Sequence, residues 1–188
     1  RFLFAERRID PRVAEWCGLT SISAPAACWR YGKPFYDAPS LLIPYYDRDG
    51  RLVSVQGRYL GDRTTEPFRP RFRFPRGSNC HIYGLQILRM LRKGEELWIT
   101  EGCSDCWAML SAGHKAIAVP SATLLRDEDM GLLRDCNARL GTTFHIYPDQ
   151  DAPGERLFLQ LRDRLPDITR HQLPSGCKDF GEWWGRGS

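Results

Sequence analysis

The sequence predicts an α/β domain, built as a parallel sheet with helices on both faces, preceded by a smaller basic α+β subdomain that contains an antiparallel hairpin. Two observations lead to this fold class. In the second half of the 188-residue chain, short apolar runs alternate with helical segments at the spacing typical of a parallel sheet. Up to about residue 80, prolines and glycines are too dense for long helices. We therefore expect the basic subdomain over residues 1–94 and the α/β domain over residues 95–188.

The first half is expected to contain one short helix and one hairpin. Asp10, followed by proline, is typical of a helix cap and first turn, so a helix should run to about Cys17. Residues 41–46 and 52–60 have the composition of strands, and the turn-forming residues 47–50 lie between them. The two strands should therefore pair as an antiparallel hairpin.

The second half is expected to alternate strictly between strands and helices. A helix that ends at Gly94 should lead into it. The expected strands are residues 97–100, 116–119, 142–147 and 168–173. The expected helices are residues 82–93, 104–112, 125–139, 154–165 and 179–184.

Composition and cysteine usage exclude several classes of protein. The chain is 42% hydrophobic and 27% charged, and no apolar run approaches the length that spans a bilayer. We therefore expect a cytoplasmic protein, in the bacterial nucleoid or a host cytoplasm, with no membrane partner. Cys103 and Cys106 form a CxxC pair, but no second pair completes a tetrahedral site, so we expect no zinc. Because the first residue is Arg1, we expect a fragment of a longer chain.

A short stretch of the first half is rich in arginine and phenylalanine. This interleaving is typical of a surface that contacts phosphates and bases, although a solvated basic face is the alternative. The net charge of +4 is modest, so the clustering of the charges matters more than their sum. The residues are Arg58, Arg63, Arg69, Arg71, Arg73 and Arg76, with Phe68, Phe72 and Phe74 between them.

Acidic residues follow three of the four strands expected in the second half. Glu101 comes directly after the first strand, and Asp105 lies one helical turn further on. Asp149 and Asp151 follow the third strand, and Asp179 follows the fourth. Because ligands of open α/β sheets bind at the carboxyl ends of the strands, these acids should lie around one site.

Converging carboxylates repel one another in a partly dehydrated crevice, so such a site favours a cation. Carboxylates without a histidine or thiol cage suit Mg²⁺, or Mn²⁺ in its place. Two ions could polarise a phosphoryl group, activate a 3′-hydroxyl and stabilise a pyrophosphate leaving group. The alternative for each acid is structural: Asp149 or Asp179 could be a helix cap, and Asp105 a surface acid in a first turn.

Three motifs in the second half resemble the toprim fold of bacterial DnaG-type primases and phage primase-helicases. Residues 99–105 match the family's hydrophobic-EGxxD block, residues 149–154 match DxDxxG, and residues 178–179 match its KD block. Toprim domains also occur in topoisomerases, recombination proteins and nucleases, so the first half narrows the resemblance. There, residues 8–18 are similar to the first helix of the primase amino-terminal subdomain, and residues 42–53 are similar to its hairpin.

The resemblance implies a primase catalytic core that synthesises short RNA primers on DNA with Mg²⁺ or Mn²⁺. It implies that Glu101 acts with the metal or as a base near the 3′-hydroxyl. It implies metal binding by Asp149 and Asp151, with Asp105 and Asp179 in support. Its implied partners are a single-stranded DNA template, NTPs, the nascent RNA primer and a replicative helicase, fused or recruited. The residues that it assigns to nucleic acid or nucleotide phosphates are Arg58, Arg71, Arg73, Arg76 and Lys178.

One departure from the family pattern keeps two alternatives open. Family members often carry a further acid two positions after the KD block, where this chain has Gly181. A second metal site would therefore have one acidic ligand fewer. One alternative is a toprim nuclease, in which the same acids activate water. The other is a catalytically degenerate module of a phage or mobile element that binds single-stranded DNA. The histidines, including His145 and His171, show no ligand spacing and receive no role.

Overall fold

The computed structural model describes residues 1–23, 26–27, 34–62, 64–75, 77–78, 82–119, 125–165 and 167–187. Within these residues the chain forms an antiparallel four-stranded sheet, a parallel four-stranded sheet and one further strand pair, β2 (Ala26–Ala27) with β3 (Pro34–Tyr36). The fold class expected from the sequence is confirmed. None of the helices described is both long and apolar enough to span a bilayer.

The antiparallel sheet contains the predicted hairpin. Its strands lie in the order β1-β4-β5-β6, and each neighbouring pair is antiparallel. At the hairpin turn, Asp47 Oδ1 accepts hydrogen bonds from the backbone N–H groups of Asp49 and Arg51, at 2.8 and 2.9 Å. Gly50 follows with φ of 81°, a conformation that favours glycine. The bounds are β1 (Thr20–Ile22), β4 (Ser40–Tyr46), β5 (Leu52–Tyr59) and β6 (Phe72–Arg73).

Two short helical elements precede this sheet. Asp10 caps α1 (Pro11–Trp16) by accepting a hydrogen bond from the backbone N–H of Arg12 at 2.8 Å, as the sequence predicts. The first element, η1 (Phe2–Glu6), is a single π-helical turn that the sequence did not predict, because it has no side-chain cap at its start.

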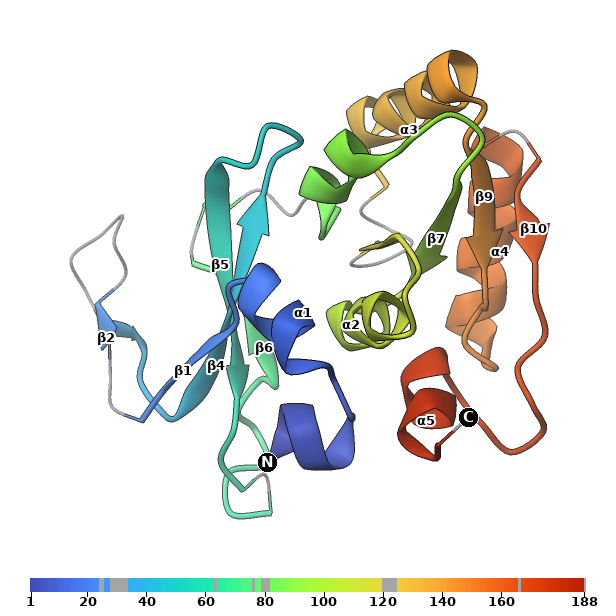
Figure 1. The fold of residues 1–188 in the computed structure, drawn as a ribbon. Helices are drawn as coiled ribbons and strands as arrows, with labels where there is room; N and C mark the ends of the chain where they lie inside the picture. Colours follow the sequence, from blue (N-terminus) through green and yellow to red (C-terminus); the bar gives the residue numbers. More distant parts are fainter. Residues whose placement is uncertain are drawn as a thin grey trace.

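The second half forms the predicted parallel sheet with helices on both faces (Figure 1). The strands lie in the order β10-β9-β7-β8, and all three pairings are parallel. The strands are β7 (Glu96–Thr100), β8 (Ala116–Ala118), β9 (Thr143–Ile146) and β10 (Thr169–Arg170). The helices are α2 (Cys103–Ser111), α3 (Asp127–Leu140), α4 (Ala152–Arg164) and α5 (Phe180–Gly185).

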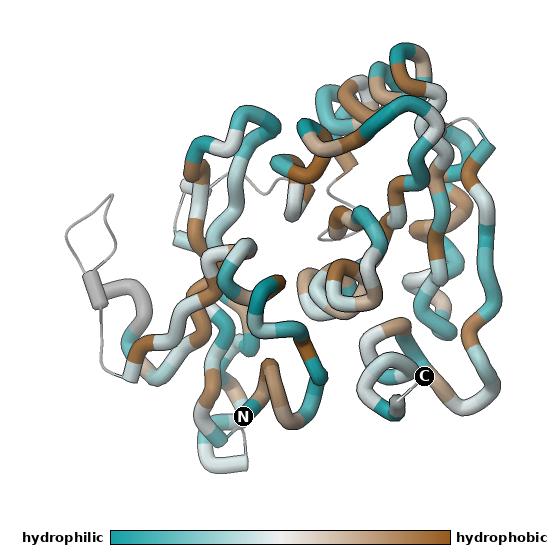
Figure 2. The backbone as a smooth tube through the Cα atoms, viewed as in Figure 1, coloured by the Kyte–Doolittle hydropathy of each residue, from teal (hydrophilic) through white to brown (hydrophobic). Residues whose placement is uncertain are grey.

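Each face of the parallel sheet packs into its own hydrophobic core. Trp98 of β7 packs with α2, α5 and the inner face of the antiparallel sheet. Its neighbours Leu97 and Ile99 point to the opposite face and pack with α3 and α4. Helices α1 and α2 therefore lie between the two sheets, and the halves share a core (Figure 1). The tip of the β4–β5 hairpin is hydrophilic, in contrast to the apolar stretches of α2 and β7 (Figure 2).

Two predicted elements differ in extent. The helix expected over residues 82–93 is a shorter 3-10 helix, η2 (Leu85–Met90), because Tyr83 pairs with Ala118 as an isolated bridge before it. The strand expected over residues 168–173 is only β10, and pairing ends when His171 donates its N–H to Ile146 O at 2.8 Å. Pro174 has no N–H with which to extend the ladder. The domain boundary at residue 94 stays a prediction.

Candidate active site

Four carboxylates gather beyond the carboxyl ends of the parallel strands. Glu101 follows β7 directly, and its Oε1 accepts a hydrogen bond from the backbone N–H of Asp149, beyond β9, at 3.0 Å. Asp105 lies on α2 and accepts from the backbone N–H of Gly181 at 2.9 Å, which places it beside the start of α5. Asp179 precedes α5, and its negative charge acts on Asp105. The structure thus brings together four acids from three segments of the chain, which follow β7, β9 and β10.

Gly154, the glycine of the DxDxxG motif, allows this close approach. A Cβ atom at this position would lie 2.7 Å from Glu101 Oε1 and 2.3 Å from the backbone oxygen of Asp149. Both distances are shorter than any ordinary contact between such atoms. The first turn of α4 can therefore lie against the Glu101 carboxylate only because position 154 has no side chain.

Asp151 has a different environment from the other acids. It caps α4 by accepting from the backbone N–H of Gly154 at 3.0 Å, and its Oδ2 lies 3.2 Å from Lys178 Nζ. The hydrogen bond from Gly154 is the main reason that the pKa of Asp151 is lowered. Asp179 also caps its helix, at 2.7 Å from the backbone N–H of Glu182. The capping alternative therefore describes part of what Asp179 does, but the cap of α4 is Asp151 and not Asp149. Asp105 is buried, so it is not a surface acid.

Burial raises the pKa values of the clustered acids. It raises the pKa of Asp149 to about 8, and the charges of Glu101 and Asp105 add to the shift. It raises the pKa of Asp105 to about 7, with a further contribution from Asp179. The pKa of Glu101 is also raised, again mainly by burial. Near neutral pH the cluster therefore holds protons that a divalent cation would displace.

These pKa values predict that, in the absence of divalent cations, the contribution of the clustered acids to stability falls as pH rises. A carboxyl group with a raised folded-state pKa stabilises the fold below its unfolded pKa, and that contribution is lost as pH rises through the folded value. For Asp149 the window runs from 3.8 to about 8. In chelator, the melting temperature of Asp149→Asn should therefore rise relative to that of the wild type as pH increases across this window. An equal pH dependence for the two proteins would contradict the assignment.

The donor set suits a hard cation that also binds substrate. It consists of carboxylate oxygens, the ligands preferred by Mg²⁺ and Mn²⁺. Among the residues that the structure describes, no three Asp, Glu, His or Cys side chains converge closely enough to hold an ion by themselves. This agrees with Mg²⁺ chemistry, in which one or two carboxylates are completed by water and by phosphate oxygens of the substrate. The roles of Glu101, Asp105, Asp149, Asp151 and Asp179 stay predictions.

Arg58 and Arg71 line a pocket of about 510 Å³ together with Glu6. The guanidinium of Arg58 lies 3.5 Å from the centre of the Phe2 ring, and burial followed by repulsion from Arg71 lowers its pKa to about 10. A pKa of that size leaves Arg58 fully charged at neutral pH. The structure therefore places two of the predicted phosphate-binding arginines side by side in one concave surface.

The other residues of the basic stretch differ in their surroundings. Arg73 lies 3.2 Å from Asp37, which also pairs with Arg69 at 2.6 Å. Phe68 is 97% exposed, in a loop that the ion pairs of Arg69 with Asp37 and Glu66 hold in place. Arg63 and Arg76 lie outside the described residues. Phe68 and Arg71 are thus exposed, whereas Arg73 is half-buried. That this surface binds nucleic acid stays a prediction.

Arg7, which received no role from the sequence, connects the basic pocket to the acids. Its Nη1 lies 3.8 Å from Asp179 Oδ1, and it lines a pocket of about 400 Å³ with Glu6, Lys178 and Asp179. Glu6 also lines the pocket of Arg58, so the two pockets adjoin. No sequence signal near Arg7 points to this, because its partners lie at the other end of the chain.

A pair of histidines was also missed. His145 Nδ1 lies 3.0 Å from His171 Nε2, and both rings lie against Trp98, with centroids 5.1 and 4.7 Å away. Burial and the neighbouring His145 lower the pKa of His171. The pair joins β9 to the segment after β10, and only the parallel pairing of these strands brings it together.

Proteins that are similar to this chain in sequence or fold include DNA primases. No family model matches the chain. The DNA primase of Clostridium acetobutylicum is 27% identical over 149 residues, which are 76% of this chain and 24% of that protein. The RNA polymerase domain of Mycobacterium tuberculosis primase DnaG, solved with a double-stranded DNA oligomer that has a 6-nucleotide overhang, superposes with a TM-score of 0.72. Its identity is 18%, over 97% of this chain and 70% of that chain.

The chain has the fold of a DnaG-type primase catalytic core. The primase fragment of the bacteriophage T7 primase-helicase superposes with a TM-score of 0.64 at 14% identity, over 96% of this chain and 67% of that chain. The resemblance to bacterial and phage primases seen in the sequence is thereby confirmed. The chain spans about a quarter of the length of the Clostridium primase.

Within this primase fold, position 181 is the place where the chain departs from the family pattern. A Cβ atom on Gly181 would lie 2.5 Å from Asp105 Oδ1 and 3.5 Å from Asp179 Oδ1. A side chain here would therefore project into the cluster, toward Asp105 and Asp179. In this chain Asp105 occupies that space and bonds to the Gly181 backbone.

Proposed function

We propose that this chain is the catalytic core of a DNA primase, which makes short RNA primers on a single-stranded template. The 3′ oxygen of one nucleotide attacks the α-phosphorus of an incoming NTP, pyrophosphate leaves, and the 3′-hydroxyl proton passes to a nearby base. The observation that supports this proposal most is the acid cluster, which lies at the carboxyl edge of the parallel sheet and adjoins the pocket of Arg58 and Arg71.

The acids are proposed to bind two divalent cations, Mg²⁺ or Mn²⁺. These ions would neutralise phosphate charge and lower the pKa of the attacking hydroxyl. Glu101 is held in position by the backbone N–H of Asp149. Burial raises its pKa, so it accepts a proton more readily than an exposed carboxylate would. Asp149 and Asp105 are proposed to share the metal with it, and Lys178 is proposed to hold a phosphate beside Asp151.

The basic surface is proposed to guide the template and the primer. Arg58, Arg71 and Arg7 form a path of positive charge that ends at Asp179. The related M. tuberculosis domain was solved with DNA, and the T7 relative is a primase-helicase, so single-stranded DNA and a helicase, fused or recruited, are the proposed partners. The proposed location of this primer synthesis is the cytoplasm or the nucleoid. We propose that residues 1–94 bind nucleic acid and NTPs and that residues 95–188 form the catalytic domain.

Removing the charges of Arg58 and Arg71 should weaken DNA binding regardless of sequence. The double variant Arg58→Gln, Arg71→Gln should bind a fluorescent single-stranded oligonucleotide about tenfold less tightly, with a salt slope lower by about 0.7 per lost phosphate contact. Anisotropy at several salt concentrations measures both. Arg162→Gln, an exposed position on α4, is the matched control. An unchanged salt slope would show that these arginines do not contact phosphates.

The nuclease alternative is tested without nucleotides. The protein is incubated with labelled single-stranded DNA and Mg²⁺ or Mn²⁺, first without and then with NTPs. A primase leaves the DNA intact and forms RNA only when NTPs are added. Cleavage without NTPs would favour the nuclease, and DNA binding with neither activity would favour the degenerate module that Gly181 keeps open.

A further inference from the structure

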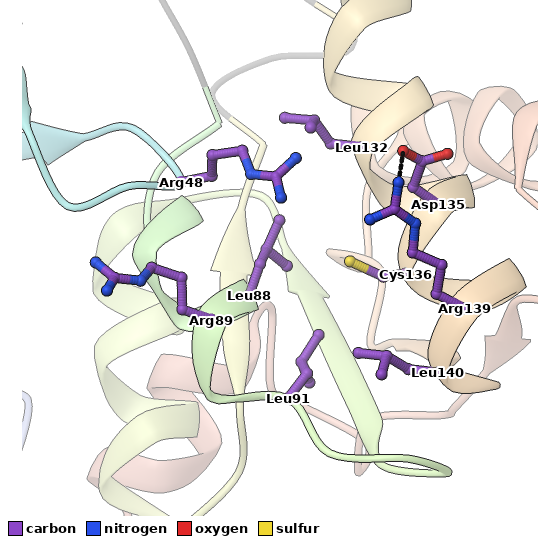
Figure 3. A pocket seen from close by; sticks show the side chains of 9 residues that line it. All are labelled: Arg48, Leu88, Arg89, Leu91, Leu132, Asp135, Cys136, Arg139 and Leu140. Carbon is purple, nitrogen blue, oxygen red and sulfur yellow. Dashed lines mark ion pairs between the residues drawn. The ribbon is translucent and has the colours of Figure 1, made fainter.

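A third pocket lies at the opposite end of the parallel strands from the acids. It has a volume of about 300 Å³ and is lined by Leu88, Leu91, Leu132, Leu140, Cys136, Asp135, Arg48, Arg89 and Arg139 (Figure 3). Leu91 precedes β7 and Leu140 precedes β9, so the pocket lies at the amino ends of these strands. It shares no residue with the pockets beside the acids. Template bound at the acids therefore does not account for it.

Three segments from both halves of the chain form this pocket. Arg48 comes from the tip of the β4–β5 hairpin, Leu88, Arg89 and Leu91 come from η2 and its end, and the remaining residues come from α3. Arg89 holds the hairpin in place by donating a hydrogen bond to Asp49 O at 2.8 Å. An occupant would therefore contact the hairpin and the α/β half together.

The chemistry of the walls selects a particular kind of ligand. The floor consists of leucines. Among the described lining residues there are three arginines and one acid, Asp135, which lies 3.9 Å from Arg139. Arg48 reaches over Leu88 at the mouth, as Figure 3 shows. An apolar floor beneath an excess of positive charge favours a ligand with an apolar group and more than one negative charge.

The pocket lacks the groups that usually bind a nucleotide base. None of the described residues that line it is aromatic, so none of them offers a ring on which a base could stack. Its aliphatic floor is instead suited to one apolar side chain of a peptide. We propose that this pocket binds an acidic peptide segment of a partner protein, which inserts an apolar side chain among the leucines and directs carboxylates toward Arg48 and Arg139. This inference does not depend on the proposed primer synthesis.

The test uses a fluorescein-labelled peptide of four aspartates followed by two leucines. It should bind the wild-type protein in an anisotropy titration, and the variant Arg48→Glu, Arg139→Glu should bind it about tenfold less tightly. Both positions are exposed, so folding should be retained, which circular dichroism checks. Arg162→Glu on α4 should bind like wild type. A peptide with serines in place of the leucines should bind more weakly.

Cys136 gives a second measurement that requires no variant. It lies on the pocket wall, so bound peptide should slow its alkylation by N-ethylmaleimide, followed by peptide mass spectrometry. Equal binding after charge reversal, equal binding of the serine peptide, or an unchanged rate at Cys136 would overturn the proposal. Displacement of the peptide by ATP together with protection of Cys136 by ATP would overturn it in favour of a nucleotide site.

Discussion

Glu101→Gln should reduce primer synthesis by about 100-fold or more, because a neutral amide can neither bind a divalent cation strongly nor accept a proton. The amide oxygen can still accept the hydrogen bond from the Asp149 backbone, so the fold should be retained. The measurement is the rate of labelled RNA formed on a single-stranded template at saturating Mg²⁺.

The control for this change is Glu155→Gln. Glu155 lies in the first turn of α4 and pairs with Arg170 at 2.7 Å, away from the clustered acids. Its substitution should leave the rate within about twofold, since exposed ion pairs contribute little. If Glu101→Gln made primers at the wild-type rate, the chemistry assigned to the cluster would be wrong.

Metal binding distinguishes a failed site from a failed reaction. Calorimetric titration with Mg²⁺ or Mn²⁺ should show binding by the wild-type protein and its loss in the Asp149→Asn, Asp151→Asn double variant. If the protein binds metal but makes no primers, the acids form a metal site but the chain is the catalytically degenerate module. If the wild type binds no metal even with NTP, the acids do not form the proposed site.

Gly154→Ala should destabilise the fold by about 3 kcal/mol, near the upper end of the range for overpacked positions. The added methyl group would lie 2.3 Å from Asp149 O and 2.8 Å from Asp149 N, so backbone, not a flexible side chain, would have to move. The higher helix propensity of alanine, worth up to about 1 kcal/mol, cannot offset this cost. Urea or thermal unfolding measures the change.

Gly131→Ala is the matched control for this substitution. Gly131 lies inside α3, and an added Cβ would meet no atom within 4 Å. There alanine should stabilise the protein by up to about 1 kcal/mol. The two substitutions are therefore expected to have opposite signs, and a Gly154→Ala protein as stable as wild type would show that α4 does not approach Glu101 so closely. Gly154→Ala should also weaken Mg²⁺ binding, because the added methyl group would displace Glu101 and Asp149.

The features that the sequence predicted correctly depend on near neighbours along the chain. The cap at Asp10, the turn that contains Gly50 and the alternation of strands with helices each follow from local backbone and hydrogen-bonding preferences. The rule that ligands bind at the carboxyl ends of parallel strands then placed Glu101 and Asp149 on one edge before any contact was known.

Only the tertiary structure decided how those groups pair. Arg7 meets Asp179, Asp105 bonds to the Gly181 backbone, and His145 meets His171 because packing brings distant segments together. No local preference encodes such contacts, since their sequence separations leave many alternative pairings with similar local energies. The same holds for the pocket around Arg48 and Arg139, which exists only where the hairpin tip, η2 and α3 meet. The sequence by itself therefore determined the helices and strands and the end of the parallel strands where the acids lie. Long-range packing determined how deeply those acids are buried, and hence their raised pKa values, and it formed the pocket around Arg48 and Arg139.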